Sequence, residues 1–443
     1  MRRSAWIFLV LVIALLFFGV VMLYSTSYAV FGQEKLVKQL IWISMGAIGA
    51  AVISRMDYHV IGRWSRWLLG LVLLSLVYLG LSNGFSHWFH QALPFAGKIS
   101  GAFRTLVVGP LRIQPSEFAK IALILFLANY YGRQARYVLE FRRGFLIPLA
   151  VAGVVMVLVL VGGSLSVTII TGGVVVAMLL VAGVRLRYLT PILLPVVAAA
   201  VLDVVIAFHG TTPGQSLAGT VTADTYIVTV KDNEGRLVKI ALKGWTGRLL
   251  LAGEKVIGKE RTSRFVGWLN PENTQSGDGY QLWHSYLALG SGGYRGLGFT
   301  ESRMKQRYLP EAHTDFIMSI VGEELGFVTL ILVVLAYSAL TILAFWIGAQ
   351  AVDREGSLIC AGTAVSLGLH ALVNIGVASG LLPTTGVTAP FVSYGGSNIL
   401  ASCLGVGLLF SVSRFSHLRA QQETSETGEE PNRQPVPLER IFT

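Results

Sequence analysis

The stretch Trp6–Tyr24, which reads WIFLVLVIALLFFGVVMLY, contains no charged residue. A helix needs about 20 mostly apolar residues to cross the hydrocarbon core of a bilayer, so this stretch predicts a membrane span. Similar runs recur along the 443 residues, of which 53% are hydrophobic and only 13% are charged. A soluble domain averages about 25% charged residues. The composition therefore favours an integral membrane protein over one large soluble core.

The apolar runs predict an all-α polytopic membrane protein with about ten transmembrane helices. The candidate spans are Trp6–Tyr24, Leu36–Ile53, Trp67–Leu81, Phe118–Tyr131, Phe145–Val161, Leu165–Val184, Leu189–Phe208, Asp315–Phe345, Ser357–Leu381 and Phe391–Val412. The two cysteines, Cys360 and Cys403, fall inside these runs and are expected to be packing residues.

The basic residues predict the orientation, because cytoplasmic loops carry an excess of Lys and Arg. With a cytoplasmic N-terminus, the inner loops contain Arg2, Arg3, Arg55, Arg63, Arg66, Arg133, Arg136, Arg142, Arg143, Arg185, Arg187, Arg354, Arg414 and Arg419. The short outer loops contain only Lys35, Lys38, Lys98, Arg104 and Arg112. We therefore expect both termini to be cytoplasmic. The rule also accounts for most of the net charge of +11, so we expect no nucleic-acid partner.

A large extracytoplasmic loop, residues 209–314, is expected between spans seven and eight. Two β-type runs, Thr225–Val230 and Arg236–Leu242, flank KDNEG and predict a hairpin within a small β-like insert near residues 222–242. Residues 1–416 are expected to form one transmembrane domain. The polar, Pro-containing residues 417–443 are expected to be a disordered cytoplasmic tail.

The first polar motif is LRIQPSEFAK, Leu111–Lys120. Pro115 and Ser116 favour a helix start. Glu117 and Lys120 are three residues apart and so share one helix face, with Arg112 just before them. One interpretation is an ion pair with a Lys that extends to the interface. The other is a cationic cradle for an anionic headgroup, because charges inside a membrane are costly and usually functional.

The second motif is ESRMKQRYLPEAHTDFIMSIVGEELGF, Glu301–Phe327. We expect a helix to begin near Thr314 or Asp315, which places Glu323 within about a quarter turn of the Asp315 face and Glu324 away from it. Adjacent carboxylates inside a span are not typical of a solvated face. Arg303, Lys305 and Arg307 are candidates either for phosphate binding or for contact with lipid headgroups.

The third motif is ASGLLPTTGVTAPFVSYGGSN, Ala378–Asn398. Irregular backbone at membrane depth is tolerated only where it lines a cavity or is buried in protein. The motif therefore predicts either a re-entrant turn or a cavity lining built from Ser393, Tyr394, Ser397 and Asn398. Single histidines, namely His59, His209, His284 and His370, have no partner visible in the sequence and are expected to be structural or surface residues. No Cys/His cluster has metal-ligand spacing.

Together these motifs resemble the SEDS family (shape, elongation, division and sporulation), which includes FtsW, RodA and SpoVE. The likeness runs from about Ser4 to Ser416 and points to the FtsW branch. It implies an inverting peptidoglycan glycosyltransferase that polymerises lipid II at the outer face of the bacterial plasma membrane, for cell division or cell shape. It also implies a partner, a class B penicillin-binding protein with transpeptidase activity.

The implied reaction joins a GlcNAc hydroxyl to C1 of MurNAc and expels a lipid pyrophosphate. It requires a general base for the hydroxyl and cations for the departing pyrophosphate. No cofactor is evident, although a divalent cation is compatible with this chemistry. The resemblance marks Asp315 as a further catalytic candidate. The expected substrate-binding residues are Arg112, Glu117, Lys120, Lys305, His313, Glu323, Ser393 and Ser397.

The sequence departs from the family pattern at the position of the proposed catalytic Asp. Aligned on Asn270-Pro271 and Gly277-x-Gly279-Tyr280, that position is Thr274. Asp278 and Glu272 are candidate replacements, although Asp278 between two glycines is also typical of a turn. Three functions stay open: a lipid II polymerase, a lipid II flippase that needs no base, and a non-catalytic scaffold for a transpeptidase.

Overall fold

The computed structural model describes residues 2–89, 93–99, 102–109, 111–191, 225–231, 237–243, 267–268, 271, 279–306 and 308–427. The chain divides into two compact units. Unit 1 comprises Met1–Pro191, Leu332–Leu372 and Val387–Thr443. Unit 2 comprises Ile192–Ile331 and Val373–Gly386. Helices α11 (Ile317–Ala349) and α12 (Arg354–Ala378) each belong partly to both units.

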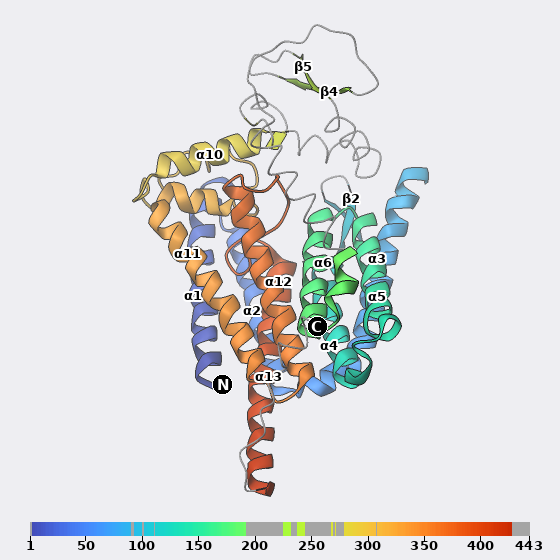
Figure 1. Ribbon diagram of the computed structural model, residues 1–443. Helices are drawn as coiled ribbons and strands as arrows, with labels where there is room; N and C mark the ends of the chain where they lie inside the picture. Colours follow the sequence, from blue (N-terminus) through green and yellow to red (C-terminus); the bar gives the residue numbers. More distant parts are fainter. Residues whose placement is uncertain are drawn as a thin grey trace. The chain divides into compact units, whose positions relative to one another are not determined.

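Unit 1 is a bundle of helices that run alongside one another (Figure 1). Besides parts of α11 and α12 it contains α1 (Arg2–Phe31), α2 (Glu34–Arg55), α3 (Tyr58–Phe89), α4 (Pro115–Arg133), α5 (Ile147–Val161), α6 (Leu165–Val181) and α13 (Gly396–Thr427). Small residues let α2 and α13 approach closely, as is common between membrane helices. A Cβ on Gly46 would lie 2.9 Å from Cys403 Sγ.

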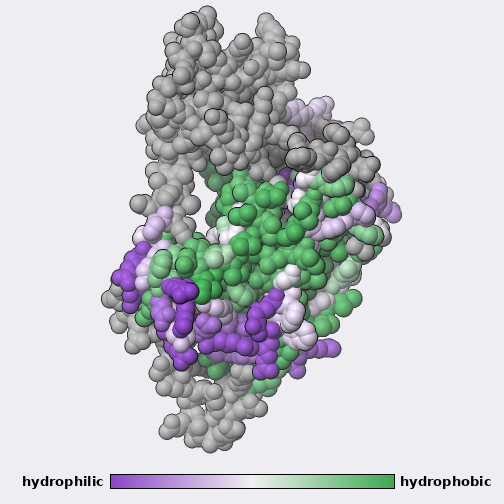
Figure 2. Space-filling model, turned by 90° about the vertical axis from the view of Figure 1, so that its right-hand side faces the viewer, coloured by the Kyte–Doolittle hydropathy of each residue, from purple (hydrophilic) through white to green (hydrophobic). Residues whose placement is uncertain are grey.

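One face of the unit 1 helices carries a broad apolar band with hydrophilic residues gathered along its lower edge (Figure 2). Large apolar side chains on α3 and α5 are exposed, including Trp67 at 75%, Leu71 at 67% and Val157 at 59%. A soluble protein would cover so large an apolar surface, whereas lipid covers it in a membrane protein.

The polytopic all-α class is confirmed. Seven described helices are long and apolar enough to cross a membrane, and α6 is a shorter apolar helix. These seven are Arg3–Ser27, Glu34–Arg55, Tyr58–Ser86, Phe141–Val161, Ile317–Ala349, Arg354–Ala378 and Gly396–Ser416. Most of the expected span Leu189–Phe208 lies outside the described residues, so the count of ten stays a prediction.

A three-stranded antiparallel sheet lies between α3 and α4 and has no counterpart among the sequence predictions. Its strands are β1 (Ala96–Ile99), β2 (Ala102–Val108) and β3 (Leu111–Ile113), in the order β1-β2-β3. Asn83 on α3 fixes the sheet, because its side chain both accepts from the N–H and donates to the carbonyl of Phe103. The sheet leads directly into α4.

Unit 2 contains strands β4 (Thr225–Lys231) and β5 (Leu237–Lys243), helix α10 (Tyr280–Gly292) and the first part of α11. Strands β4 and β5 pair antiparallel, from Thr225 opposite Lys243 to Lys231 opposite Leu237. The hairpin therefore lies where the two β-type runs predict it.

Two elements differ from their expected boundaries. Helix α13 continues to Thr427 through a segment that contains helix-forming Leu, Arg, Ala, Gln and Glu. Residues 428–443 of the expected tail lie outside the described residues, so its disorder stays a prediction. Helix α11 begins at Ile317, so Asp315 lies in the preceding turn. That turn closes through Glu311, whose φ is +54° and whose carbonyl accepts from the N–H groups of Thr314 and Phe316. Asp315 and Glu323 therefore do not share one helix, and the expected quarter turn between them does not apply.

Candidate functional site

Helix α4 begins at Pro115, as the motif predicts, and its start is tied to α13. Gln114 is extended, with φ −100° and ψ 104°, and Pro115 occupies the first helical position, where its missing N–H costs nothing. The N–H of Gln114 donates to Ser397 Oγ at 2.9 Å, and that hydroxyl donates to the carbonyl of Arg112 at 3.3 Å. Ser397 thus joins the first turn of α13 to the segment that carries Arg112.

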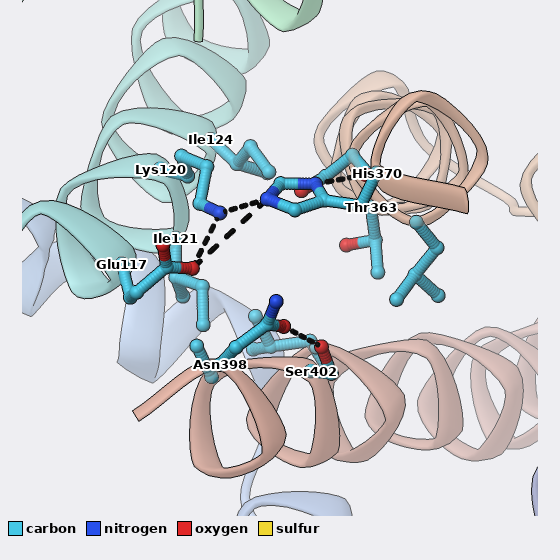
Figure 3. Close-up of a pocket in the computed structure, with 13 residues that line it drawn as sticks. Glu117, Lys120, Ile121, Ile124, Thr363, His370, Asn398 and Ser402 are labelled. Atoms are coloured by element: carbon cyan, nitrogen blue, oxygen red, sulfur yellow. Dashed lines mark hydrogen bonds and ion pairs between the residues drawn. The ribbon is translucent and has the colours of Figure 1, made fainter. Parts of the chain in front are cut away.

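A buried polar cluster, which we name the Lys120 cluster, consists of Glu117, Lys120 and His370 (Figure 3). Lys120 Nζ lies 2.7 Å from Glu117 Oε2 and 2.5 Å from His370 Nε2. All three residues are buried, with exposures of 7%, 4% and 3% in chain order. Charged side chains are found at such depth only when they are paired, which the cluster achieves across α4 and α12.

The tautomer of His370 follows from its second contact. His370 Nδ1 lies 2.7 Å from the carbonyl oxygen of Ser366, which can only accept, so Nδ1 carries the hydrogen. Nε2 of the neutral ring is then an acceptor for the Lys120 ammonium. The ammonium has three hydrogens, and Glu117 and His370 take two of them among the described residues. One donor is left for an oxygen that enters the cluster.

The Lys120 cluster borders a small cavity that Asn398 and Ser402 of α13 also line (Figure 3). Ser402 Oγ donates to Asn398 Oδ1 at 3.0 Å, while Asn398 Nδ2 donates to Thr388. Apolar side chains, among them Ile124 and Leu408, complete the lining. The cavity measures about 20 Å³, which is space for one water molecule. In this conformation it encloses no sugar.

Residues of the third motif, Ala378–Asn398, have both of the roles that the sequence left open: some line a cavity and others hold the backbone of the turn. Asn398 lines the cavity. Ser393 instead holds the backbone, since its hydroxyl accepts from Ala389 N–H at 2.8 Å and its carbonyl accepts from Gln39 at 3.2 Å. Ser397 has the similar bridging role already described. Neither serine lines the cavity beside the Lys120 cluster.

Arg112 is exposed on β3 and belongs to a separate group of cations around Tyr394. Lys35 Nζ lies 5.9 Å from the centre of the Tyr394 ring, and Lys38 and Arg112 interact electrostatically with its hydroxyl. The sequence identified Arg112 as a candidate but treated Lys35 and Lys38 only as loop charges.

In unit 2, Glu323 anchors the loop before α11. Its side chain is fully buried and its carboxylate accepts from Ser302 Oγ at 2.5 Å and from the N–H of Arg303 at 3.0 Å. A third donor, the N–H of Met304, lies 3.4 Å away. The carboxylate therefore fixes the backbone of residues 302–304, and its oxygens are occupied by the protein rather than presented to a ligand.

Glu324 is buried as well and pairs with Lys305, whose Nζ lies 2.7 Å from Glu324 Oε1. Neither adjacent carboxylate lies on a solvated face, as the sequence indicated. The helix is interrupted two residues later at Gly326, with φ +80° and ψ 178°. The carbonyls of Glu323 and Glu324 accept instead from the N–H groups of Leu297 and Gly298. Lys305 is thus engaged with its own protein.

Asp315 and His313 lie in the turn before α11. His313 is buried and Asp315 is half-buried. The backbone carbonyl of Asp315 accepts from Asn374 Nδ2 at 2.9 Å, and a Cβ on Gly386 would lie 3.6 Å from Asp315 Oδ2. Asp315 is therefore packed beside the irregular segment that follows α12.

Several predicted site residues lie outside the described residues: Glu272, Thr274, Asp278 and Arg307. Their roles stay predictions. In the part of the chain that the structure describes, no group of three or more His, Cys, Asp or Glu residues is arranged to hold a metal ion.

His370 is the site residue that sequence reasoning missed. It was expected to be a structural or surface histidine, yet it completes the Lys120 cluster from 250 residues away in the chain. The signal available was its place in the apolar run Ser357–Leu381, where an ionisable side chain is costly without a partner. The sequence does not reveal which span supplies that partner.

The chain resembles known proteins along most of its length. A family model described as "Cell cycle protein", of the FtsW, RodA and SpoVE type, matches residues 5–218 and 226–418. The chain is 32% identical to a probable peptidoglycan glycosyltransferase FtsW of Trichlorobacter lovleyi, over 92% of each chain. It is 30% identical to stage V sporulation protein E of Bacillus subtilis, covering 92% of this chain and 96% of that one.

Two solved structures share the fold. One, described as "Structural coordination of polymerization and crosslinking by a peptidoglycan synthase complex", matches with a TM-score of 0.63 at 24% identity, over 93% of this chain and 98% of that one. The rod shape determining protein RodA of Thermus thermophilus matches with a TM-score of 0.58 at 23% identity, over 93% and 97% of the two chains.

Proposed function

Because the chain belongs to the FtsW, RodA and SpoVE family of cell cycle proteins, we propose that it is a peptidoglycan glycosyltransferase that polymerises lipid II. Relatives that match it over nine-tenths of their length carry that activity in their names, such as the FtsW proteins of Trichlorobacter lovleyi and Geobacter sp.. The role proposed for it is synthesis of cell-wall glycan in division or in the maintenance of cell shape.

The observation that carries the proposal is the Lys120 cluster. A purely structural ion pair needs only two partners, and replacing such a pair by apolar residues is often neutral or stabilising. Here three ionisable side chains from two helices converge, and they leave one ammonium hydrogen directed to no described partner. A lipid-linked pyrophosphate presents oxygens that such a donor would bind and stabilise as charge develops on the leaving group.

Two sets of cations are available for this role: Lys120 within the bundle, and the group of Lys35, Lys38 and Arg112 around Tyr394. A cavity of about 20 Å³ is too small for a sugar, so substrate entry requires the space among α4, α12 and α13 to widen. We assign Lys120 to charge stabilisation and His370 to holding its ammonium in place.

The general base remains the open part of the mechanism. Family likeness assigns it to the position of Thr274, whose hydroxyl is not ionised at neutral pH. We propose Asp278 as the base, with Glu272 and Asp315 as the other carboxylates to test. Incubating purified wild-type protein with lipid II, alone and with its transpeptidase, should give glycan chains on a gel. Asp278→Asn should abolish these chains. An unchanged rate of polymerisation would show that Asp278 is a turn residue without a catalytic role.

A lipid II flippase is the second candidate, and Thr274 is the observation that favours it. A flippase requires the membrane domain and its cations but no base. Transbilayer movement of labelled lipid II without polymer would support it. If wild-type protein gives no chains under either condition while Thr274→Asp restores them, the polymerase proposal for the natural chain is overturned.

We further propose a class B penicillin-binding protein as partner and lipid II as substrate. The proposed location is the bacterial plasma membrane with both termini in the cytoplasm. One structural relative comes from a peptidoglycan synthase complex that coordinates polymerisation and crosslinking, which supports the partner. A divalent cation stays a proposal that chelation of the assay mixture would test, since loss of chains on adding chelator and recovery with Mg²⁺ would establish it.

A further inference from the structure

A second cavity lies at the other end of α4, about 20 Å along the helix from Lys120. It measures about 740 Å³, within the range of about 300–1,000 Å³ that small-molecule sites occupy. The starts of α3 and α12 and the end of α4 form it. Its lining residues are His59, Arg63, Arg66, Asn129, Gly132, Arg133, Asp353, Arg354 and Glu355.

Four guanidinium groups converge on this cavity from three helices. Those of Arg63, Arg66 and Arg133 have no carboxylate within ion-pair distance among the described residues. Arg354 donates through Nη2 to the carbonyl of Ala182, while its Nε is buried with no hydrogen-bond partner in the described structure. The lining therefore offers several cationic donors that the protein itself does not satisfy.

The two carboxylates of the lining accept hydrogen bonds from groups other than arginine, and Arg133 interacts with Glu355 only electrostatically. Asp353 accepts from Tyr58 Oη at 2.6 Å and from the N–H of Gly356 at 2.7 Å, and His59 Nε2 lies 2.7 Å from it. Burial raises the pKa of Asp353, but the hydrogen bonds from His59, Tyr58 and Gly356 outweigh burial and bring that pKa below its ordinary value. Asp353 thus has a full set of donors without an arginine.

Glu355 is also buried, with an exposure of 6%, and accepts from Asn129 Nδ2 at 2.9 Å. Gly62 on α3 and Gly132 on α4 face it, and a Cβ on Gly132 would lie 3.0 Å from Glu355 Cβ. These glycines allow α12 to pack against α3 and α4 at the floor of the cavity. The floor of the cavity is therefore built from packed polar groups, with Asn129 and Glu355 buried, while Arg63, Arg66 and Arg133 are exposed.

We propose that this cavity binds a phosphate-bearing anion at the end of the membrane domain opposite the Lys120 cluster. Planar guanidinium groups match phosphate oxygens in bidentate geometry, which makes Arg the preferred residue for such anions. Basic pockets between membrane helices on the cytoplasmic side are suited to anionic lipid headgroups. A soluble phosphate compound has the same chemistry, so both sources are tested below.

An excess of arginine at cytoplasmic helix ends is expected from membrane topology alone. Topology explains the number of arginines at this end, but it requires neither a cavity of ligand size nor a buried Nε without a partner. The control variant is therefore chosen from arginines that topology explains equally well. Arg55 and Arg142 are exposed at the same end of the unit 1 helices and do not line the cavity.

The test uses full-length protein in mild detergent. Native mass spectrometry would compare the number of bound phosphatidylglycerol molecules with the number of bound phosphatidylcholine molecules. The shift in melting temperature on adding inorganic phosphate or pyrophosphate would report binding of these soluble anions. Arg63→Gln with Arg133→Gln should weaken anion binding by about tenfold or more, because two charge-assisted contacts are lost. Arg55→Gln with Arg142→Gln, which removes the same charge, should change it by less than about twofold. Arg63→Lys with Arg133→Lys keeps the charge and should give an intermediate affinity.

Selective phosphatidylglycerol binding that the Arg63/Arg133 variant loses would identify a lipid headgroup as the ligand. A saturable stabilisation by phosphate or pyrophosphate, lost in the same variant, would identify a soluble source. Equal binding by wild type, site variant and control would overturn the proposal, because the arginines would then act only as non-specific surface charges. The activity assay plays no part, so failure here is distinguishable from failure of the polymerase proposal.

Discussion

At the scale of single residues, the arrangement around Lys120 decides which substitutions are informative. Its ammonium is held by a carboxylate one helical turn away and by an imidazole from another helix. Removal of one member leaves a buried charge without its partner, at a cost of about 3–5 kcal/mol. Loss of activity in a single variant therefore has to be separated from loss of folding.

His370→Leu should reduce polymerisation of lipid II by about tenfold or more, because the Lys120 ammonium loses the acceptor that positions it. His370→Gln offers an amide oxygen and should retain an intermediate rate. The rates come from a gel assay with lipid II, and melting temperatures confirm that both variants are folded. Equal rates for the leucine and glutamine variants would show that the acceptor at position 370 does not matter.

Glu323→Gln should lower the free energy of unfolding by about 1–3 kcal/mol, because hydrogen bonds from Ser302 and Arg303 to a charged acceptor become bonds to a neutral amide. Denaturation of the protein in detergent measures this. Glu301→Gln is the matched control, since Glu301 is exposed just before the same loop. A stability equal to that of the control would remove Glu323 from its anchoring role.

At the scale of helices and turns, the break in α11 at Gly326 depends on glycine. Its φ of +80° is unfavourable for other residues, and an added Cβ would meet the carbonyl oxygen of Tyr294. Gly326→Ala should therefore destabilise the protein by about 2 kcal/mol or more. Gly290→Ala on α10 is the control, because no atom lies within 4 Å of its added Cβ. A melting temperature unchanged in both variants would contradict the account.

The starts of α3 and α12 are joined by Asp353, which makes stability depend on pH. Its pKa is lower in the folded protein, so its contribution is present above the ordinary carboxyl pKa and is lost as pH falls through the folded value. Asp353→Asn should lower the melting temperature most at pH 7, and the difference from wild type should shrink below about pH 4. A difference that grows as pH falls would contradict this sign.

At the scale of the whole molecule, the sequence predicts the membrane class, most helices and the start of α4. These features depend on local composition and on short-range signals such as Pro115. It does not predict the sheet β1–β3, whose strands are too short to stand out beside long apolar runs. Nor does it predict that His370 meets Lys120 or that Arg354 meets Arg133 around one cavity, because such contacts depend on which helices become neighbours.

The expected topology is also a property of the whole chain. A fluorescent protein fused after residue 427 should fold and emit, because that terminus is expected in the cytoplasm. Alkaline phosphatase inserted in the hairpin between Lys231 and Leu237 should be active, because the loop is expected outside. If alkaline phosphatase were active when fused at the C-terminus and inactive in the hairpin, the expected orientation would be wrong and the arginine cavity would lie on the outer side.

The most direct test of the central claim is polymerisation of lipid II by the protein with and without the charges of the Lys120 cluster. Lys120→Ala and the paired replacement Glu117→Gln with Lys120→Met should both give no glycan chains. The paired variant should melt near the wild-type temperature, because no unpaired charge remains. Lys98→Ala should polymerise normally, because Lys98 is exposed on β1. Normal chains from the folded paired variant would contradict the claim that this buried cluster serves the reaction.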